Sequence, residues 1–306
     1  MAKKIVFMGT PKFSVQTLEI LAKSNFEIAC VYTQPPKKSD RGQKINSSPV
    51  SLAAKKLNLK IRTPSSLEDE KEYNYFKSIG AYIVIVVAYG KIIPRNYLSI
   101  PEKGFLNIHA SLLPKWRGAA PIQRSIMNRD KETGISFMKI EEDLDTGPFI
   151  NQIKVKIDNQ TTAKSLSDEL SKIGAENIIK TINLIESEKA KFVIQDHTQA
   201  IYAKKINKKE SKIIWNEKAN YIIAKINSLN PNPGAWFELN GSRYKIWKAL
   251  ISELQGIPGT ILDEKLTIAC KDKSIKVIEI QKEGKNKIGI EDFLKGNKMK
   301  KGIKVS

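Results

Sequence analysis

Five consecutive apolar residues, Ile83-Val84-Ile85-Val86-Val87, constrain the fold more than any other feature of the sequence. A strand that is apolar at every position is covered on both faces, as in parallel sheets with helices on each side. Apolar stretches predict strands at Lys4–Met8, Glu27–Tyr32, Tyr82–Ala88, Phe105–His109 and Gly134–Ile140. Amphipathic stretches predict helices near Ser14–Ala22, Val50–Leu57, Leu67–Ser78, Ala119–Met127 and Ala163–Ile185. This alternation predicts an open, mostly parallel α/β sheet.

The pattern changes after residue 204, where short strands replace the alternation. Asn240-Gly241 separates the runs Ala235–Leu239 and Ser242–Trp247, which is the strongest short signal for a β-hairpin. Further elements are expected as a helix at Ala219–Ile226 and strands at Thr260–Leu262, Leu266–Ala269 and Ile275–Ile280. The Lys-rich tail from Lys295 to Lys304 is expected to fray. Short strands joined by tight turns predict a small β-barrel.

A chain of 306 residues is long enough for two domains. We therefore predict an N-terminal Rossmann-like domain at residues 1–190 and a smaller barrel domain at residues 205–306. Between them, residues 191–204 lose the regular pattern and are predicted to be a linker.

The sequence has a net charge of +20, from 52 Lys and Arg against 32 Asp and Glu. Residues 201–306 contain 22 basic and 11 acidic residues, so they hold +11 of this charge, and residues 1–200 hold +9. A basic domain indicates a polyanionic partner, with nucleic acid first among the candidates. An AT-rich genome, which favours lysine codons, would produce the same excess, so charge alone does not decide between the two.

Cysteine and histidine are scarce. Cys30 and Cys270 lie far apart in apolar segments, and their spacing fits neither a metal site nor a disulfide framework. We therefore predict no metal and a reducing, cytoplasmic location. No apolar run reaches the ~18 residues of a membrane helix, and residues 1–4 lead directly into a predicted strand, so neither a membrane span nor a signal segment is expected.

One of the two histidines ends a predicted strand in the pattern Asn107-Ile108-His109. Side chains two residues apart on a strand point to the same side, so an amide and an imidazole would lie together. Such a pair can polarise a carbonyl and stabilise the oxyanion formed when a nucleophile attacks it. A carboxylate from elsewhere in the fold would hold the imidazole in one tautomer and favour its cationic form. Taken alone, the pattern also fits a polar strand end with a satisfied histidine.

Longer motifs surround this pair. The run from Asn107 to Arg124, NIHASLLPKWRGAAPIQR, is followed by Leu144-Asp145-Thr146-Gly147-Pro148. Further segments of the same kind are Phe7–Phe13, Val87–Pro94 and Leu229–Phe237. Together these segments resemble the folate-dependent formyltransferases over nearly the whole chain and in a consistent order.

The resemblance implies transfer of the formyl group of 10-formyltetrahydrofolate to the amino group of methionine on initiator tRNA, for translation initiation. It implies that Asn107, His109 and Asp145 are catalytic and that an OB-like barrel at residues 205–306 binds tRNA. It also implies folate contacts from Ser111, Leu112, Leu113 and Pro114, and from backbone near Val86–Gly90. The alternative for Leu112 and Leu113 is the protein core, because apolar residues after a strand usually pack inward. No metal or covalent intermediate is needed, and a monomer is expected.

Residues 34–49 form a long, Pro-, Gly- and Ser-containing insertion after a predicted strand. Lys37, Lys38, Arg41 and Lys44 make this insertion attractive to phosphates and bases. As a charge run alone it fits a solvated, mobile loop, whereas the resemblance implies a loop that enters the acceptor end of tRNA.

Two other readings stay open. A related formyltransferase would use a small amine acceptor, either an amino-sugar nucleotide or a glycinamide ribonucleotide. The glycinamide type typically lacks a second domain, so residues 205–306 disfavour it. A tRNA-binding protein without activity is disfavoured because Asn107, His109 and Asp145 are all present. Asp143, where the family usually has a small residue, fits a solvated acidic turn, and His197 fits a structural or solvated position.

Overall fold

The computed structural model describes residues 2–39 and 44–306. It divides into two compact units. Unit 1 consists of Met1–Gly118, Gly134–Val155 and Ser167–Tyr202, and unit 2 consists of Ala119–Thr133, Lys156–Leu166 and Ala203–Ser306. The predicted boundaries at residues 190 and 205 stay a prediction.

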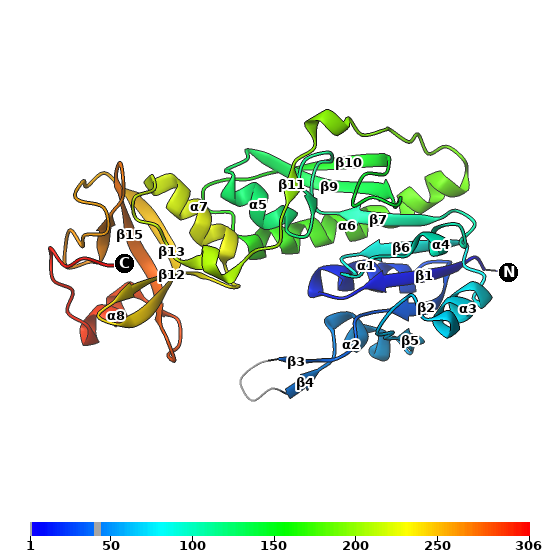
Figure 1. The fold of residues 1–306 in the computed structure, drawn as a ribbon, viewed down its shortest axis with the longest axis horizontal. Coiled ribbons are helices and arrows are strands. Elements are labelled where there is room, and N and C mark those ends of the chain that lie inside the picture. The colour runs from blue at the N-terminus through cyan, green and yellow to red at the C-terminus, as the bar shows by residue number, and fades with distance from the viewer. Residues whose placement is uncertain (1, 40–43) are drawn as a thin grey trace. The chain divides into compact units, whose positions relative to one another are not determined.

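The main sheet has seven strands in the order β10-β9-β7-β6-β1-β2-β5 (Figure 1). Their bounds in that order are Phe149–Lys156, Glu132–Lys139, Phe105–His109, Ile83–Val87, Lys4–Gly9, Glu27–Tyr32 and Ile61–Arg62. The five strands from β7 to β5 run parallel, and β9 is antiparallel to β7. The predicted mostly parallel sheet is therefore confirmed, and β10 is a strand that the sequence pattern did not reveal.

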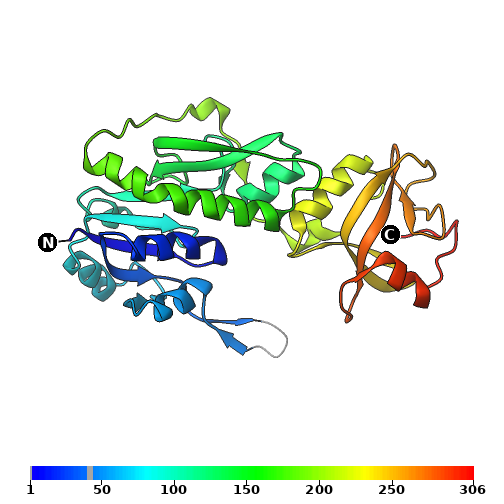
Figure 2. The ribbon, with the colours of Figure 1, turned by 180° about the vertical axis from the view of Figure 1, so that it is seen from behind.

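Helices cover both faces of this sheet. Their bounds are α1 Val15–Ala22, α2 Pro49–Lys56, α3 Glu70–Ser78, α4 Arg95–Leu98 and α6 Ala163–Glu186, with 3-10 turns η1 Lys12–Ser14 and η2 His197–Gln199. Phe76 of α3 and Tyr97 of α4 share one core cluster with Val84 and Val86 of β6. Figure 2 shows α1 and the long α6 on the opposite face, where Gly174 of α6 permits close approach to Ile108 of β7. Both faces are buried, which explains why β6 is apolar throughout.

Unit 2 contains a five-stranded antiparallel sheet in which β12, β13, β15 and β14 follow one another and β16 pairs with β15. The strands are β12 Ala235–Leu239, β13 Ser242–Ser252, β14 Thr267–Ala269, β15 Ser274–Lys282 and β16 Ile288–Gly289. The helices of this unit are α5 Pro121–Met127, η3 Lys208–Ser211, α7 Ala219–Leu229 and α8 Ile290–Gly296. Asn240 and Gly241 have φ angles of 49° and 72°, as the tight turn between β12 and β13 requires. The predicted hairpin is confirmed.

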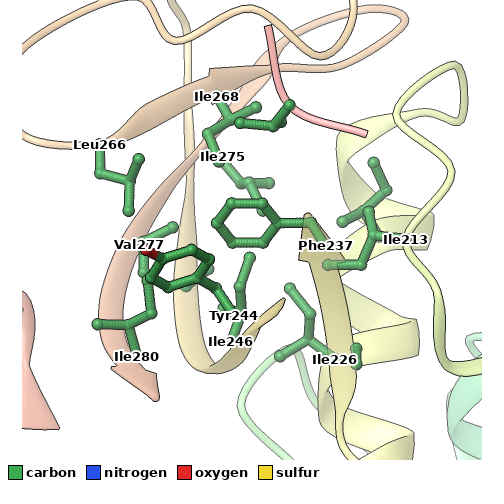
Figure 3. Packing of buried hydrophobic residues seen from close by; sticks show 14 of the residues in the cluster. Ile213, Ile226, Phe237, Tyr244, Ile246, Leu266, Ile268, Ile275, Val277 and Ile280 are labelled. Atoms are coloured by element: carbon green, nitrogen blue, oxygen red, sulfur yellow. The ribbon is translucent and has the colours of Figure 1, made fainter. Parts of the chain in front are cut away.

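The curled sheet of unit 2 surrounds an apolar core, shown in Figure 3. Phe237 of β12 and Tyr244 of β13 stack with ring centroids 5.6 Å apart. Both residues are at alternate, inward-facing positions of their strands, and their neighbours in sequence face outward. This pattern confirms the predicted small β-barrel class of the second part.

Two local expectations are wrong. Thr260–Leu262 is not a strand, since among the described residues it makes only isolated bridges, Thr260 with Lys304 and Ile261 with Ile268. The C-terminal tail does not fray, because Ser306 exchanges two backbone hydrogen bonds with Glu238 and Val305 is only 7% exposed. The tail supplies the backbone partners that a neighbouring strand would otherwise provide.

The basic insertion also differs from the expected irregular loop. Within the described residues it contains two short antiparallel strands, β3 Lys37–Ser39 and β4 Lys44–Asn46. Cross-strand backbone pairing therefore shapes both arms of the insertion. None of the helices in residues 2–39 and 44–306 is long and apolar enough to cross a membrane.

Candidate active site

The carboxyl ends of the parallel strands β1, β6 and β7 lie at one edge of the main sheet, where ligands bind in open α/β folds. Thr10, just after β1, donates from its hydroxyl to the carbonyl of Tyr89, just after β6, at 2.8 Å. Asn107 and His109 are on β7, paired with Val86 of β6 and Ser136 of β9 respectively. The strand geometry therefore places both side chains on the same side of β7.

The His109 imidazole is almost fully enclosed, with its side chain 6% exposed. Its Nε2 lies 2.9 Å from the backbone carbonyl of Trp116, and because a carbonyl only accepts, Nε2 carries a proton. Its Nδ1 lies 3.5 Å from a carboxylate oxygen of Asp145. Since both ring nitrogens face oxygen acceptors, the surroundings accommodate the doubly protonated imidazolium.

Asp145 is held by more than its histidine partner. The same carboxylate oxygen that faces His109 accepts a hydrogen bond from the backbone N–H of Gly118 at 2.8 Å. Its side chain is 13% exposed, so little water competes for these interactions. A carboxylate with one fixed donor can orient a neighbouring imidazole.

Asn107 is half-buried, and its side-chain amide makes no hydrogen bond in the described part of the chain. The N–H groups of this amide are therefore available to a substrate oxygen. An available amide donor beside an imidazolium is the arrangement that stabilises a tetrahedral oxyanion.

The backbone around this site adopts uncommon conformations. Trp116, Asp145 and Ala88 have positive φ angles of 62°, 54° and 47°. Each belongs to a segment next to the site: Trp116 supplies the carbonyl to His109, Asp145 supplies the carboxylate, and Ala88 follows β6. Residues with side chains reach this region only when the surrounding structure compensates, and such residues concentrate at functional sites.

The four predicted folate contacts fall into two groups. Ser111 and Leu113 are buried, and the Ser136 hydroxyl ties them together by donating to the Ser111 carbonyl and accepting from the Leu113 N–H. Leu112 and Pro114 keep partly exposed surface. Leu112 and Pro114 are thus the members of this set whose side chains a ligand can reach directly.

Polar side chains donate hydrogen bonds to backbone carbonyls at the end of β6 and just after it. Ser14 donates to the Val87 carbonyl at 2.5 Å, and the Gln34 amide donates to the carbonyls of Tyr89 and Gly90 at 3.1 and 3.0 Å. Gln34 begins the basic insertion, and its amide oxygen accepts from Lys37 at 2.5 Å. The base of the insertion is therefore joined to the same strand edge as Asn107 and His109.

The other predicted loop residues are less completely placed. Lys38 is in the middle pair of the β3–β4 ladder, opposite Ile45, and Lys44 is in the end pair, opposite Ser39. Arg41 lies outside the described residues. Asp143 is exposed, and its backbone carbonyl accepts from the Thr146 hydroxyl at 3.1 Å.

Sequence reasoning missed a buried polar group beside the site. Arg117, 1% exposed, donates twice to the side-chain oxygen of Gln195, at 3.0 and 2.8 Å. His197, expected to be structural or solvated, has its Nδ1 3.4 Å from the same guanidinium. Gln195 lies in the predicted linker, where nothing in the sequence marked it.

Neither cysteine is suited to act as a nucleophile. Burial raises the pKa of Cys30 to about 11 and that of Cys270 to about 12. Both thiols are therefore protonated at neutral pH, and the thiolate is the reactive form.

Two family models match the chain. The formyl transferase model covers residues 3–182, and the model of the formyl transferase C-terminal domain covers residues 205–298. The chain belongs to the formyl transferase family. The site around His109 and Asp145 lies within the first match, and the curled sheet of unit 2 lies within the second.

Similar proteins in this family are named methionyl-tRNA formyltransferase. The protein of Pelagibacter ubique is 52% identical over 308 aligned residues, covering 100% of this chain and 99% of its own length. The protein of Chelativorans sp. is 41% identical and is covered completely, as is this chain. That of Brucella abortus is 41% identical over 97% of this chain and 99% of its own length.

Solved structures of other formyltransferases share the fold. WlaRD, a sugar 3N-formyl transferase solved with dTDP and 5-N-formyl-THF, has a TM-score of 0.68 at 24% identity, covering 94% of this chain and all of that one. An N-formyltransferase of Helicobacter canadensis has a TM-score of 0.68 at 21% identity, covering 92% of this formyltransferase and all of that chain. At these identities the likeness concerns the fold alone.

Proposed function

We propose that this formyltransferase moves the formyl group of 10-formyltetrahydrofolate to the amino group of methionine on initiator tRNA. The observation that carries the proposal is the meeting of Asn107, His109 and Asp145 at the carboxyl edge of the sheet. The choice of acceptor is supported by relatives named methionyl-tRNA formyltransferase that match the whole chain at 39–52% identity.

The reaction is an acyl transfer between two nitrogens. The neutral methionine amine attacks the formyl carbon, the carbonyl oxygen becomes an oxyanion, and the bond from carbon to the folate N10 then breaks. The amine loses a proton and N10 gains one. Asn107 donates an N–H to the oxyanion and His109 donates a second from Nε2, while Asp145, 3.5 Å from Nδ1, orients the imidazole.

Trp116 sets how His109 takes part. The Nε2 proton of His109 points at the Trp116 carbonyl at 2.9 Å, so a substrate oxygen must share this proton with that carbonyl. The left-handed backbone at Trp116 fixes the carbonyl in this position. We assign to Trp116 the role of holding the proton in place until the formyl oxygen arrives.

Folate supplies the formyl carbon and the leaving nitrogen. Leu112 and Pro114 present partly exposed apolar surface after β7, which suits a flat aromatic ring system. Ser111 and Leu113 are buried and contribute by fixing the backbone of the same segment. The backbone from Val86 to Gly90, held by Ser14 and Gln34, is assigned to the edge of the pterin.

The acceptor tRNA is assigned to two basic regions. The first is the insertion with Lys37, Lys38, Arg41 and Lys44, which begins at the same strand edge as the catalytic residues. The second is the domain at residues 205–306, which carries a net charge of +10. We propose a catalytic domain at 1–190, a linker at 191–204 and a tRNA-binding domain at 205–306.

The outer face of the β12–β13 hairpin combines aromatic rings with cations. The Arg243 guanidinium lies 4.3 Å from the centre of the Trp236 ring, and Lys287 lies 5.7 Å from the centre of the Trp247 ring. Both tryptophans are partly exposed. Rings and cations on one surface bind nucleic acid through stacking and phosphate contacts.

We further propose that the protein acts in the cytoplasm as a monomer.

One assay distinguishes the possible acceptors. The purified protein is given labelled 10-formyltetrahydrofolate together with Met-tRNA, an amino-sugar nucleotide or glycinamide ribonucleotide. We expect label in Met-tRNA and none in the small amines. Label in a small amine would replace the proposed acceptor, and folate-independent tRNA binding without any transfer would indicate a non-catalytic protein.

Arg41 tests the role of the insertion. Arg41→Ala is expected to weaken use of Met-tRNA, and Arg41→Lys to restore it only partly, because a planar guanidinium stacks and pairs with phosphate better than an ammonium. Donor affinity should stay within about twofold. Intact tRNA formylation with impaired folate binding would instead make the insertion a folate lid.

A further inference from the structure

A buried glutamine connects two segments of the active site. Gln195 is 3% exposed, and its side-chain oxygen accepts both hydrogen bonds from Arg117. Its side-chain nitrogen donates to the carbonyl of Asp145 at 2.9 Å and to the carbonyl of Gly147 at 2.7 Å. All four hydrogen-bonding positions of the amide are used.

The orientation of this amide is fixed by its partners. A guanidinium only donates and a backbone carbonyl only accepts, so the oxygen must face Arg117 and the nitrogen must face Asp145 and Gly147. The opposite orientation would place N–H against N–H and oxygen against oxygen at about 3 Å, leaving four buried polar groups unpaired. Gln195 is therefore locked in one arrangement.

The two segments that Gln195 joins, residues 116–118 and 145–147, are also in contact at His109 and Asp145. Trp116 and Gly118, on either side of Arg117, bond to His109 and to the Asp145 carboxylate. Asp145 thus has its carboxylate held through Gly118 and its carbonyl held through Gln195. Asp145, Gly118, Arg117 and Gln195 are therefore linked in a closed ring.

Asp145 needs such support because its backbone is strained. Its φ angle of 54° is unfavourable for a residue with a side chain, and the loop has to be held in place from outside. On its other side, Gly147 lies so close to the end of β9 that an added Cβ would be 2.0 Å from the Lys139 carbonyl. Gln195 and β9 therefore hold the turn 145–147 between them.

We propose that Gln195 is a positioning residue for catalysis: it holds the Asp145 backbone so that the carboxylate faces His109. Arg117 anchors Gln195 from the opposite side. This inference rests on the proposed function of Asp145, and it gives a catalytic reason for a buried amide in a segment that otherwise reads as a connection between domains.

Gln195→Glu separates the two halves of the network. A glutamate has the same length and still accepts from Arg117, but its carboxylate has no N–H for the carbonyls of Asp145 and Gly147. We expect kcat for Met-tRNA formylation to fall by about 10- to 100-fold, since displacement by about 1 Å has effects of this size. The KM for formyl-folate should stay within about twofold.

Gln199→Glu is the matched control. It makes the same chemical change four residues away, on an exposed side chain whose amide, within the part of the chain that the structure describes, bonds only to Asp196. We expect activity within about twofold of the unaltered protein. Thermal denaturation of each variant shows whether it is folded, and Gln195→Asn, which keeps the amide but is too short to span both sides, replaces Gln195→Glu if that variant does not fold.

A double variant shows whether Gln195 acts through Asp145. Asp145→Ala is expected to lose most activity, and adding Gln195→Glu to it should cost less than about twofold more. A further loss as large as that in the single variant would indicate a general structural role and overturn the inference. The inference would also be overturned if the Gln195→Glu single variant kept its kcat while the Asp145→Ala single variant was impaired. The proposed function would then stand. Unaltered activity of Asp145→Ala would instead overturn the proposed function together with this inference.

Discussion

Replacing Asp145 by asparagine removes one negative charge and almost no volume. In the protein the carboxylate is 3.5 Å from the His109 ring and accepts from the Gly118 N–H, and an asparagine oxygen can keep the second of these interactions. The perturbation therefore acts mainly on the electrostatic partner of the imidazolium. The fold should be retained.

The separation of the two groups sets the size of the effect. Two unit charges 3.5 Å apart interact by about 5 kcal/mol when the effective dielectric constant is about 20. Each 1.4 kcal/mol or so corresponds to a factor of ten in rate, so the ceiling is roughly a 10³-fold loss. Solvent reaches part of the carboxylate, and we expect a decrease in kcat of about 10²- to 10³-fold.

The measurement is single-turnover formylation of Met-tRNA at saturating formyl-folate, with enzyme in excess. Asp143→Asn is the matched control, because it removes a carboxylate from an exposed position in the same loop and should leave the rate within about twofold. If both Asp145→Asn and Asp143→Asn react within about threefold of the unaltered protein, then the charge of Asp145 does not accelerate formyl transfer. The proposed role of the pair would then be wrong.

Three further outcomes are expected. Asn107→Ala should lower kcat by about 10²-fold or more with little change in folate affinity, as measured by steady-state kinetics, because it removes an oxyanion donor. Trp247→Ala should weaken tRNA binding by about tenfold in a filter-binding assay and leave folate binding unaltered; equal affinity would exclude stacking on this ring. The hydrogen bond from Arg124 lowers the pKa of Glu210, so this pair stabilises the protein above the ordinary glutamate pKa of about 4.3, and its contribution is lost as the pH falls through the lowered pKa. Glu210→Gln should therefore reduce stability by about 1 kcal/mol at pH 7, and the difference in melting temperature should shrink as the pH falls below about 4.3; a pH-independent difference would contradict this origin.

The sequence predicted the fold best where burial leaves a regular pattern. The bounds of β2, β7 and β12 match the predicted strands Glu27–Tyr32, Phe105–His109 and Ala235–Leu239. Each of these strands packs at least one face into a core, so apolar residues recur with the period of a strand. β10 was missed because it is at the edge of the sheet and alternates only weakly between exposed and buried residues.

The candidate site was only partly readable from the residues. The spacing within β7 indicated that Asn107 and His109 share a side, but Asp145 entered through resemblance alone, since no periodicity relates residues 36 positions apart. Gln195 had no signal of either kind. Its partners lie 48 to 78 residues away in sequence, so its role exists only once the chain has folded.

The two donors of the proposed oxyanion site differ in how the protein uses them. His109 has both nitrogens directed at protein oxygens, whereas the Asn107 amide has no hydrogen-bonding partner among the described residues. Removing a group with partners leaves buried acceptors unpaired, and removing one without partners does not. Changes at His109 should therefore lower both stability and rate, and changes at Asn107 should lower the rate alone. That separation follows from the hydrogen bonds, because a donor reserved for the substrate contributes nothing to folding and its loss is felt only in the transition state.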